Sequence, residues 1–208
     1  QVNSMSVNLK KLNESFVENV KGMFDGQKDI FKKKIDDLKQ VIKDAQADIE
    51  TYQKDLKNPH QLFDEQLGLM LDESKNDIQT KIELLNRGLK DSMSQVKLGK
   101  DFDQIREGYS RALSYAKQLH EVYVEQNNPE GMQRTQNLYL ALLNAQNERL
   151  QQQIGLRQQL IDKTNKELEN QKARQAEFEK QFEGFKGLKK DSTIQDFDKM
   201  AAKLYAAA

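Results

Sequence analysis

Apolar residues in the first part of the chain recur alternately three and four positions apart, the heptad spacing of a helix that packs against other helices. The pattern is strictest over residues 31–56. Its members are Phe31, Ile35, Leu38, Ile42, Ala45, Ile49, Tyr52 and Leu56. The spacing predicts a long amphipathic helix. Asn58 and Pro59 should end it, because proline lacks an N–H and pushes the preceding residue out of the helical region.

The same spacing occurs nearer the N-terminus, but in a different phase. Met5, Leu9, Leu12 and Phe16 keep the heptad interval, and Val20 and Phe24 then shift its phase. Gly22 and Gly26 fall at this shift, and glycine is a poor helix former. We therefore expect a weakened or broken helix around these two glycines.

A short apolar stretch follows Pro59 and is predicted to form a short, well-buried helix. Its apolar members are Leu62, Phe63, Leu67, Leu69, Met70 and Leu71. Ser74 is the expected N-cap of the next helix, whose apolar face runs from Ile78 to Val96. Gly99 is expected to stop that helix.

Two further helices are predicted in the second half. The first covers residues 101–126, with Phe102, Ile105, Tyr109, Ala112, Ala116, Leu119 and Tyr123 on its apolar face. Residues 127–131 then form a turn, with Asn128 as N-cap and Pro129 at the first helical position. The longest helix follows, to about residue 185. Its apolar positions are Leu138, Leu142 and Ala145, then Leu150, Ile154, Leu160, Ile161 and Leu168 with some drift, and finally Phe178, Phe182 and Phe185. A short last helix is expected over 191–204.

These helices predict an all-α protein, because each apolar face must be buried against another helix. Short connections favour antiparallel neighbours, and the length of the last long helix exceeds the diameter of a compact domain of this mass. We expect an elongated, coiled-coil-like three-helix antiparallel bundle made of residues 1–57 and 101–208. Residues 58–100 would be a small helical appendage inserted into this bundle.

Composition narrows the function classes. Among 208 residues, 33 Lys and Arg balance 33 Asp and Glu, so no general field attracts nucleic acid, and we expect no nucleic-acid partner. There is no cysteine, which excludes disulfides and zinc–thiolate sites. No run approaches the roughly 18 apolar residues of a membrane span, so we expect no transmembrane segment.

Patterns that would indicate catalysis or metal binding are missing from the sequence. The two histidines, His60 and His120, lack the spacing of zinc or di-iron sites. Lys100 follows Gly99, but the rest of a phosphate-binding loop is absent. We therefore predict no catalytic residues, no metal, no cofactor and no enzyme activity.

One stretch of the longest predicted helix carries a family resemblance. It reads Asn144, Ala145, Gln146, Asn147, Glu148, Arg149 and Leu150, followed by Gln151, Gln152, Gln153, Ile154 and the pair Leu160 and Ile161. It resembles the minor pilus subunit family of bacterial conjugative type IV secretion systems. The resemblance implies an exported, non-enzymatic protein at or near the pilus tip that aids pilus assembly and contact with recipient or host cells.

The resemblance further implies a periplasmic or extracellular location after removal of an export signal. The chain begins with Gln1 and not with methionine, so either such a signal has been removed or the chain was trimmed. The expected partners are other pilus or secretion-system proteins, and in isolation we expect a monomer. The triplet Arg-Gly-Asp, which an adhesive relative could display, is absent from the sequence.

The apolar stretch after Pro59 is the candidate partner-binding patch. Its proposed contact residues are Leu62, Phe63, Leu67, Met70 and Leu71. A simpler interpretation is that these residues form the core of the appendage. Two other functions stay open from the sequence: a cytosolic coiled-coil scaffold or tether that dimerises through its long helix, and a helical tip protein of a needle-type secretion apparatus.

Overall fold

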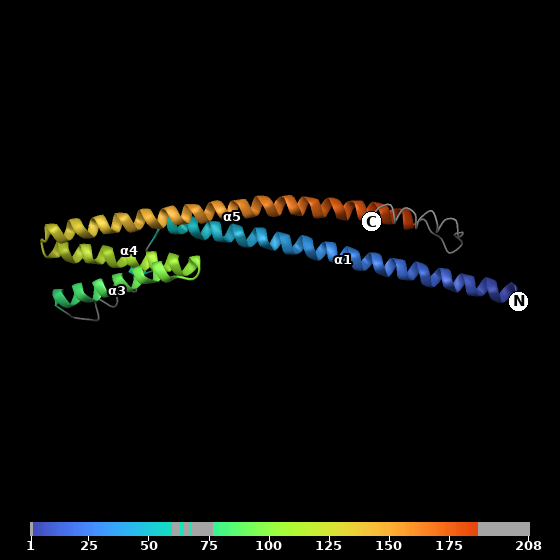
Figure 1. Cartoon of the computed structure of the whole chain (residues 1–208), viewed down its shortest axis with the longest axis horizontal. Coiled ribbons are helices and arrows are strands. Elements are labelled where there is room, and N and C mark those ends of the chain that lie inside the picture. The colour runs from blue at the N-terminus through green and yellow to red at the C-terminus, as the bar shows by residue number, and fades with distance from the viewer. Residues whose placement is uncertain (1, 60–62, 65–66, 68–76, 187–208) are drawn as a thin grey trace. The chain divides into compact units, whose positions relative to one another are not determined.

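The computed structural model of the chain describes residues 2–59, 63–64, 67 and 77–186. Its helices are α1 (Val2–Lys57), α3 (Ile78–Leu98), α4 (Phe102–Glu125) and α5 (Pro129–Lys186) (Figure 1). No strand occurs in this part of the chain, so the prediction of an all-α protein is confirmed there. The last helix expected, over residues 191–204, lies outside the described residues.

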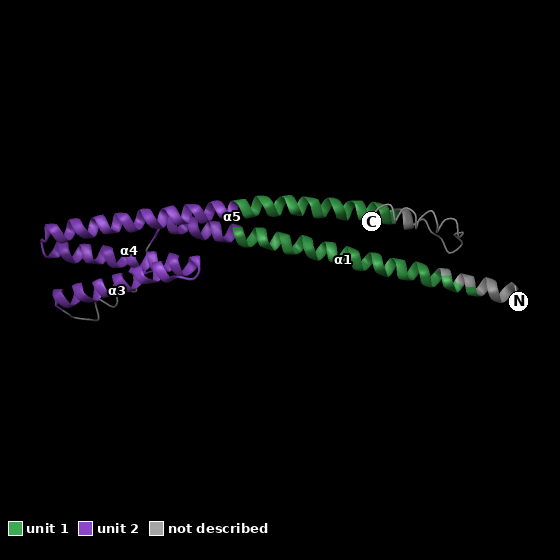
Figure 2. Cartoon of the chain, viewed as in Figure 1, with its two compact units in different colours: residues 1–45, 159–208 green, residues 46–158 purple. Residues whose placement is uncertain are grey.

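The helices are distributed over two compact units (Figure 2). One unit contains residues 1–45 and 159–208, and the other contains residues 46–158. Both α1 and α5 contribute residues to each unit. The predicted division into a bundle of residues 1–57 and 101–208 and an appendage of residues 58–100 stays a prediction.

The helix boundaries follow from capping residues. Helix α1 ends at Lys57, immediately before Asn58 and Pro59, as predicted. Gly99 caps the C-terminus of α3, also as predicted. The Asp101 carboxylate accepts a 2.9 Å hydrogen bond from the Gln104 N–H at the start of α4. Such caps satisfy backbone donors that have no partner within the helix.

The cap of α5 also lies where the sequence places it. Asn128 Oδ1 accepts a 2.9 Å hydrogen bond from the Gly131 N–H, and Pro129 is the first helical residue. The turn before it needs one left-handed residue, which is Asn127 with φ 50°. Asparagine tolerates this region better than most residues.

The prediction that Ser74 caps α3 is wrong. The N-cap is Asp77, whose carboxylate accepts a 2.7 Å hydrogen bond from the Thr80 N–H. Hydrogen bonds from the Thr80 backbone and side chain hold the pKa of Asp77 below its ordinary value. Both residue types are good caps, so only the position at which the backbone becomes helical distinguishes them.

The expected break near Gly22 and Gly26 is also wrong, because α1 continues through both glycines. Each interior glycine costs a helix only about 1 kcal/mol relative to alanine. Phe24, which lies between them, is 7% exposed and packs against two phenylalanines of α5. Burial of this ring outweighs the poor helix propensity of its neighbours.

In the first unit, α1 and α5 pack as an antiparallel pair. The Phe24 ring lies 4.0 Å from the Phe182 ring and 4.7 Å from the Phe178 ring, measured between centroids. The Phe31 ring lies 5.7 Å from that of Phe178. The order of contacts is reversed along the two helices, which shows that they run in opposite directions. Predicted positions Ile35 and Ala45 of the same face are buried.

The part of α5 in this unit buries polar residues between apolar ones. Its buried side chains are Ile161, Thr164, Leu168 and Gln171, spaced three and four apart. The prediction that Leu160 belongs to this face is wrong, since Leu160 is 38% exposed. The heptad spacing does not drift here. Threonine and glutamine occupy positions that a search for apolar residues passes over.

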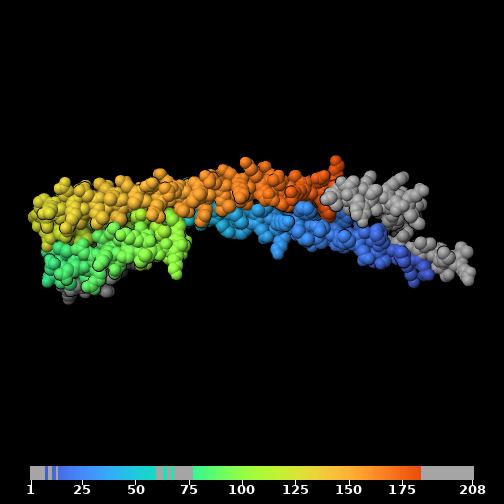
Figure 3. Space-filling view, in the orientation of Figure 1, coloured from blue at the N-terminus to red at the C-terminus, as the bar shows by residue number. Residues whose placement is uncertain are grey.

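The second unit is built around α4, which has the most buried residues of the described helices within it. A continuous core joins α4 to α3 and to the first half of α5. Figure 3 shows the outer surface of these helices, with the green α3 and α4 beside the yellow start of α5. Its fully buried members include Leu85, Leu113, Ala116 and Leu119. Tyr109 and Tyr123, predicted to be core residues, are each 7% exposed. Helix α4 runs antiparallel to both neighbours.

The close approach of α3 to α4 depends on two glycines. A Cβ atom at Gly108 would lie 2.9 Å from Val96 Cγ2 and 3.1 Å from the Ser92 carbonyl oxygen. A Cβ atom at Gly88 would lie 2.2 Å from the Tyr115 ring. Both positions therefore need a residue without a side chain.

None of the helices described combines the length and the apolar character needed to cross a membrane.

Candidate partner-binding site

The structure describes two of the five predicted patch residues, Phe63 and Leu67. Leu67 is 6% exposed and belongs to the core formed with α3 and α4. Phe63 is half-buried, and the guanidinium of Arg111 lies 5.0 Å above its ring centroid. The other predicted members, Leu62, Met70 and Leu71, lie outside the described residues. The role of the patch in binding a partner stays a prediction.

Asp64, between these two residues, ties the same segment to α4. Its Oδ1 accepts a 2.7 Å hydrogen bond from Ser114 Oγ, and its Oδ2 accepts one of 2.9 Å from Lys117 Nζ. Ser114 is 1% exposed. The hydrogen bond that Lys117 donates to Asp64 raises the pKa of the lysine above its ordinary value, partial burial opposes the shift, and the negative charge of Asp64 adds to it. The ion pair therefore favours the charged form of the lysine.

Within the second unit, two further ion pairs attach the end of α1 to α4 and α5. Arg106 Nη1 donates a 2.7 Å hydrogen bond to Asp55 Oδ2, and Arg157 Nε donates one of 2.7 Å to Asp48 Oδ2. Burial opposes the charge of Arg106, but the hydrogen bond and charge of Asp55 raise its pKa. Tyr52, 3% exposed, packs edge-on against the Phe102 ring at 5.1 Å.

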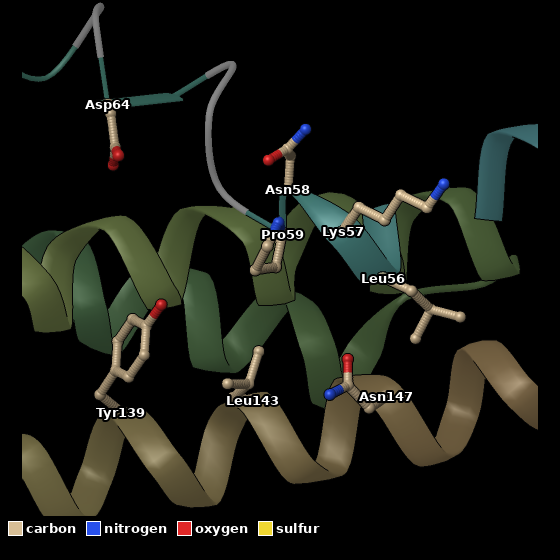
Figure 4. Close-up of a pocket in the computed structure, with 8 residues that line it drawn as sticks. All are labelled: Leu56, Lys57, Asn58, Pro59, Asp64, Tyr139, Leu143 and Asn147. Carbon is tan, nitrogen blue, oxygen red and sulfur yellow. The ribbon is translucent and has the colours of Figure 1, made fainter. Parts of the chain in front are cut away.

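A hollow of about 530 Å³ lies beside these attachments, in the second unit. In Figure 4, Tyr139, Leu143 and Asn147 project from α5 toward Pro59 and Asp64 on the opposite side. Leu56, Lys57 and Asn58, at the end of α1, complete the lining. The lining therefore mixes apolar side chains with amide, hydroxyl and carboxylate groups, as binding pockets often do.

Two of the α5 groups in this hollow have unusual surroundings. Burial raises the pKa of the Tyr139 hydroxyl, Lys117 opposes the shift, and Asp64 adds to it. The tyrosine is therefore a neutral hydrogen-bonding group near pH 7. Asn147 Oδ1 is buried and has no hydrogen-bond partner among the residues that the structure describes. A ligand donor that reached this oxygen would satisfy it.

The histidines and acidic residues that the structure describes do not gather into a cluster. No group of three His, Asp or Glu side chains in this part of the chain is placed to hold a metal ion. His120 Nδ1 lies 3.1 Å from the Met132 carbonyl oxygen and 3.1 Å from Thr135 Oγ1, so it links α4 to the first turns of α5. His60 lies outside the described residues.

The ion pairs that hold this site together were not predicted from the sequence. Asp48, Asp55 and Asp64 each meet a cation 51 to 109 positions away. Local spacing carries no information about such pairs, because the chain is rich in exposed acids and bases of the same kind. The signal that could have identified them is the position of Asp48 and Asp55 beside the predicted heptad face.

Comparison of the chain with protein-family models, with curated proteins and with solved structures finds no match.

Proposed function

We propose that the chain is a non-enzymatic minor pilus component of a conjugative type IV secretion system that aids pilus assembly and cell–cell contact. The observation that carries the proposal is the resemblance of residues 144–161 to that family. These residues lie on one long helix, α5, where Gln146 and Leu150 are buried at 1% and 0% exposure. The family likeness therefore involves residues that hold the helices together.

The finer architecture belongs to the same proposal. We propose an elongated three-helix antiparallel bundle, with residues 58–100 as an appendage. Two contacts in the second unit support it: Asp55 of α1 pairs with Arg106 of α4, and Gln146 Nε2 of α5 lies 3.3 Å from Ser110 Oγ of α4. Small-angle X-ray scattering would test this, because a bundle of this kind has a longer maximum dimension than a globule of the same mass.

The pilus role places the protein in the periplasm or on the pilus after removal of an export signal. Its partners would be other pilus or secretion-system proteins and the surface of a recipient or host cell. The patch of Leu62, Phe63, Leu67, Met70 and Leu71 is the proposed contact. Leu67 contributes to the core as well, so Phe63 is the described member better placed to meet a partner.

The test is genetic and microscopic. Immunogold labelling should place the protein on pili, and deletion of its gene should reduce both conjugation and sensitivity to pilus-specific phage. Full DNA transfer by the deletion strain would refute the role.

Analytical ultracentrifugation distinguishes the pilus component from the alternative function, a cytosolic tether, by the number of chains in the particle. The tether requires a stable dimer through the long helix, whereas the pilus component is expected to be a monomer in isolation.

A further inference from the structure

A second hollow of the second unit is an apolar groove of about 570 Å³ between α3 and α5. Tyr109 of α4 and Leu142 of α5, each 7% exposed, form its floor. Met93 and Val96 form the α3 wall, and both are half-buried. Three helices thus surround the groove on three sides and leave the fourth side open.

The wall that α5 contributes is long, and its central side chains are small. It runs from Leu138 through Ala141 and Ala145 to Arg149. These twelve residues of helix span about 16 Å, which is about three helical turns. The two alanines are one turn apart on this wall, and Ala141 is exposed, so another helix could approach α5 closely. The length and shape of the groove therefore suit one amphipathic helix better than a compact small molecule.

Two cations mark one end of the groove. Helix α3 is antiparallel to α4, which is antiparallel to α5, so the C-terminal ends of the α3 and α5 walls lie together. These ends carry Lys97 and Arg149, and no carboxylate lines the groove. Within the described part of the chain, neither cation forms an ion pair shorter than 4.0 Å. An occupant with acidic residues at this end would complement them.

We propose that this groove binds one amphipathic helix of a partner protein, with its apolar face on Tyr109 and Leu142 and with Asp or Glu side chains between Lys97 and Arg149. This mode of recognition uses apolar anchors one helical turn apart. The proposal is independent of the pilus role, because it rests only on the lining and the charges of the groove.

A second copy of the chain could compete for the groove by inserting the exposed apolar residues of its α1. Leu12, Phe16, Met23 and Ile30 are 72%, 50%, 73% and 49% exposed. Acids and lysines alternate along this stripe, with Glu14 near Lys11 and with Asp36 and Asp37 near Lys34. Neither end is therefore a purely acidic complement to Lys97 and Arg149, whereas a partner helix that ends in acidic residues alone would be.

The test uses the full chain and two synthetic peptides of 15 residues, a length chosen to cover about three helical turns with a flanking turn. Both peptides carry leucines at heptad spacing. One ends in three glutamates and its twin ends in three lysines. Fluorescence anisotropy should show at least tenfold tighter binding of the glutamate peptide. The double variant Lys97→Glu/Arg149→Glu should reverse this preference.

A matched pair of exposed α5 positions tests the place of binding. Ala141→Gln, inside the groove, should weaken binding of the glutamate peptide at least tenfold. Leu140→Gln, next to it but outside the groove, should leave binding unchanged, and circular dichroism should show both variants folded. Equal binding of the two peptides, no binding, or insensitivity to Ala141→Gln would overturn the proposal. Dimerisation abolished by Ala141→Gln would also overturn it, since the occupant would then be a second copy.

Discussion

The guanidinium of Arg106 donates a 2.7 Å hydrogen bond to the carboxylate of Asp55, which joins α4 to the last turns of α1 within the second unit. Their side chains are 23% and 18% exposed, so both charges are largely removed from water. A second carboxylate, that of Asp103, lies 3.5 Å from Arg106 Nε on the exposed side. The arginine is therefore held between one sheltered and one solvated acid.

Arg106→Ala should lower the free energy of unfolding by about 1.5 to 3 kcal/mol, because it leaves the Asp55 carboxylate sheltered and without its cation. Urea denaturation followed by circular dichroism measures the change. The control is Lys39→Ala, which removes a pair with Asp36 whose side chains are both 57% exposed. Its effect should be below about 0.5 kcal/mol. Equal losses would show that the sheltered pair contributes no more than a surface pair.

Phe24→Ala should destabilise the first unit by about 3 kcal/mol, because it removes a buried ring that contacts two others and leaves a cavity. Met23→Ala is the matched control, since Met23 precedes Phe24 on the same helix and is 73% exposed. Its effect should fall within about 0.5 kcal/mol. A comparable loss for Met23→Ala would mean that the exposed side of α1 is covered in solution.

Glycine-to-alanine substitutions should raise the stability of the fold at some sites and lower it at others. A Cβ at Gly22 or Gly26 meets nothing within 4 Å, so each substitution should stabilise α1 by up to about 1 kcal/mol through helix propensity. Gly108→Ala should destabilise, because the new Cβ meets the α3 backbone at the Val96 nitrogen, 3.0 Å away. Thermal denaturation of the single variants measures both signs. A stabilising Gly108→Ala would contradict the close packing of α3 on α4.

The Asp77 cap predicts a pH dependence. The pKa of Asp77 is lowered in the folded chain by its hydrogen bonds with Thr80, so the folded state binds fewer protons than the unfolded state. The stabilisation is complete above the ordinary pKa of 3.8 and is lost as the pH falls through the lowered value. The melting temperature of Asp77→Ala should therefore lie below that of the parent at pH 7, and the gap should close on acidification. Ser74→Ala is the control, and a larger effect there would restore Ser74 as the cap.

The all-α class and several helix ends could be predicted from the sequence, because heptad spacing and caps are local signals. The face from Phe31 to Leu56, the stop at Gly99 and the turn at Asn128 all follow from residues within one or two helical turns. The break expected at Gly22 and Gly26 shows where local signals fail. Gly22 and Gly26 are overruled by the burial of Phe24, which depends on rings more than 150 positions away.

The candidate site was less accessible to sequence reasoning. Apolarity alone pointed to the stretch around Phe63 and Leu67, but not to the neighbouring Asp64 and its contacts with Ser114 and Lys117. The groove between α3 and α5 was missed as well. It is a surface that appears only after three helices have packed, and its alanines and cations look ordinary in the linear sequence.

The buried polar residues of α5 restrict how that helix can slide along α1. Phe24 now meets Phe178 and Phe182. A displacement of one heptad would place Gln171 and Gln175 against the same ring, exchanging two aromatic neighbours for two amides. Long helices with uniform leucine faces have many equivalent alignments. In this pair the amides at Gln171 and Gln175 and the rings at Phe178 and Phe182 favour the observed alignment over that displacement, so the two chain segments are aligned by chemical identity as well as by length.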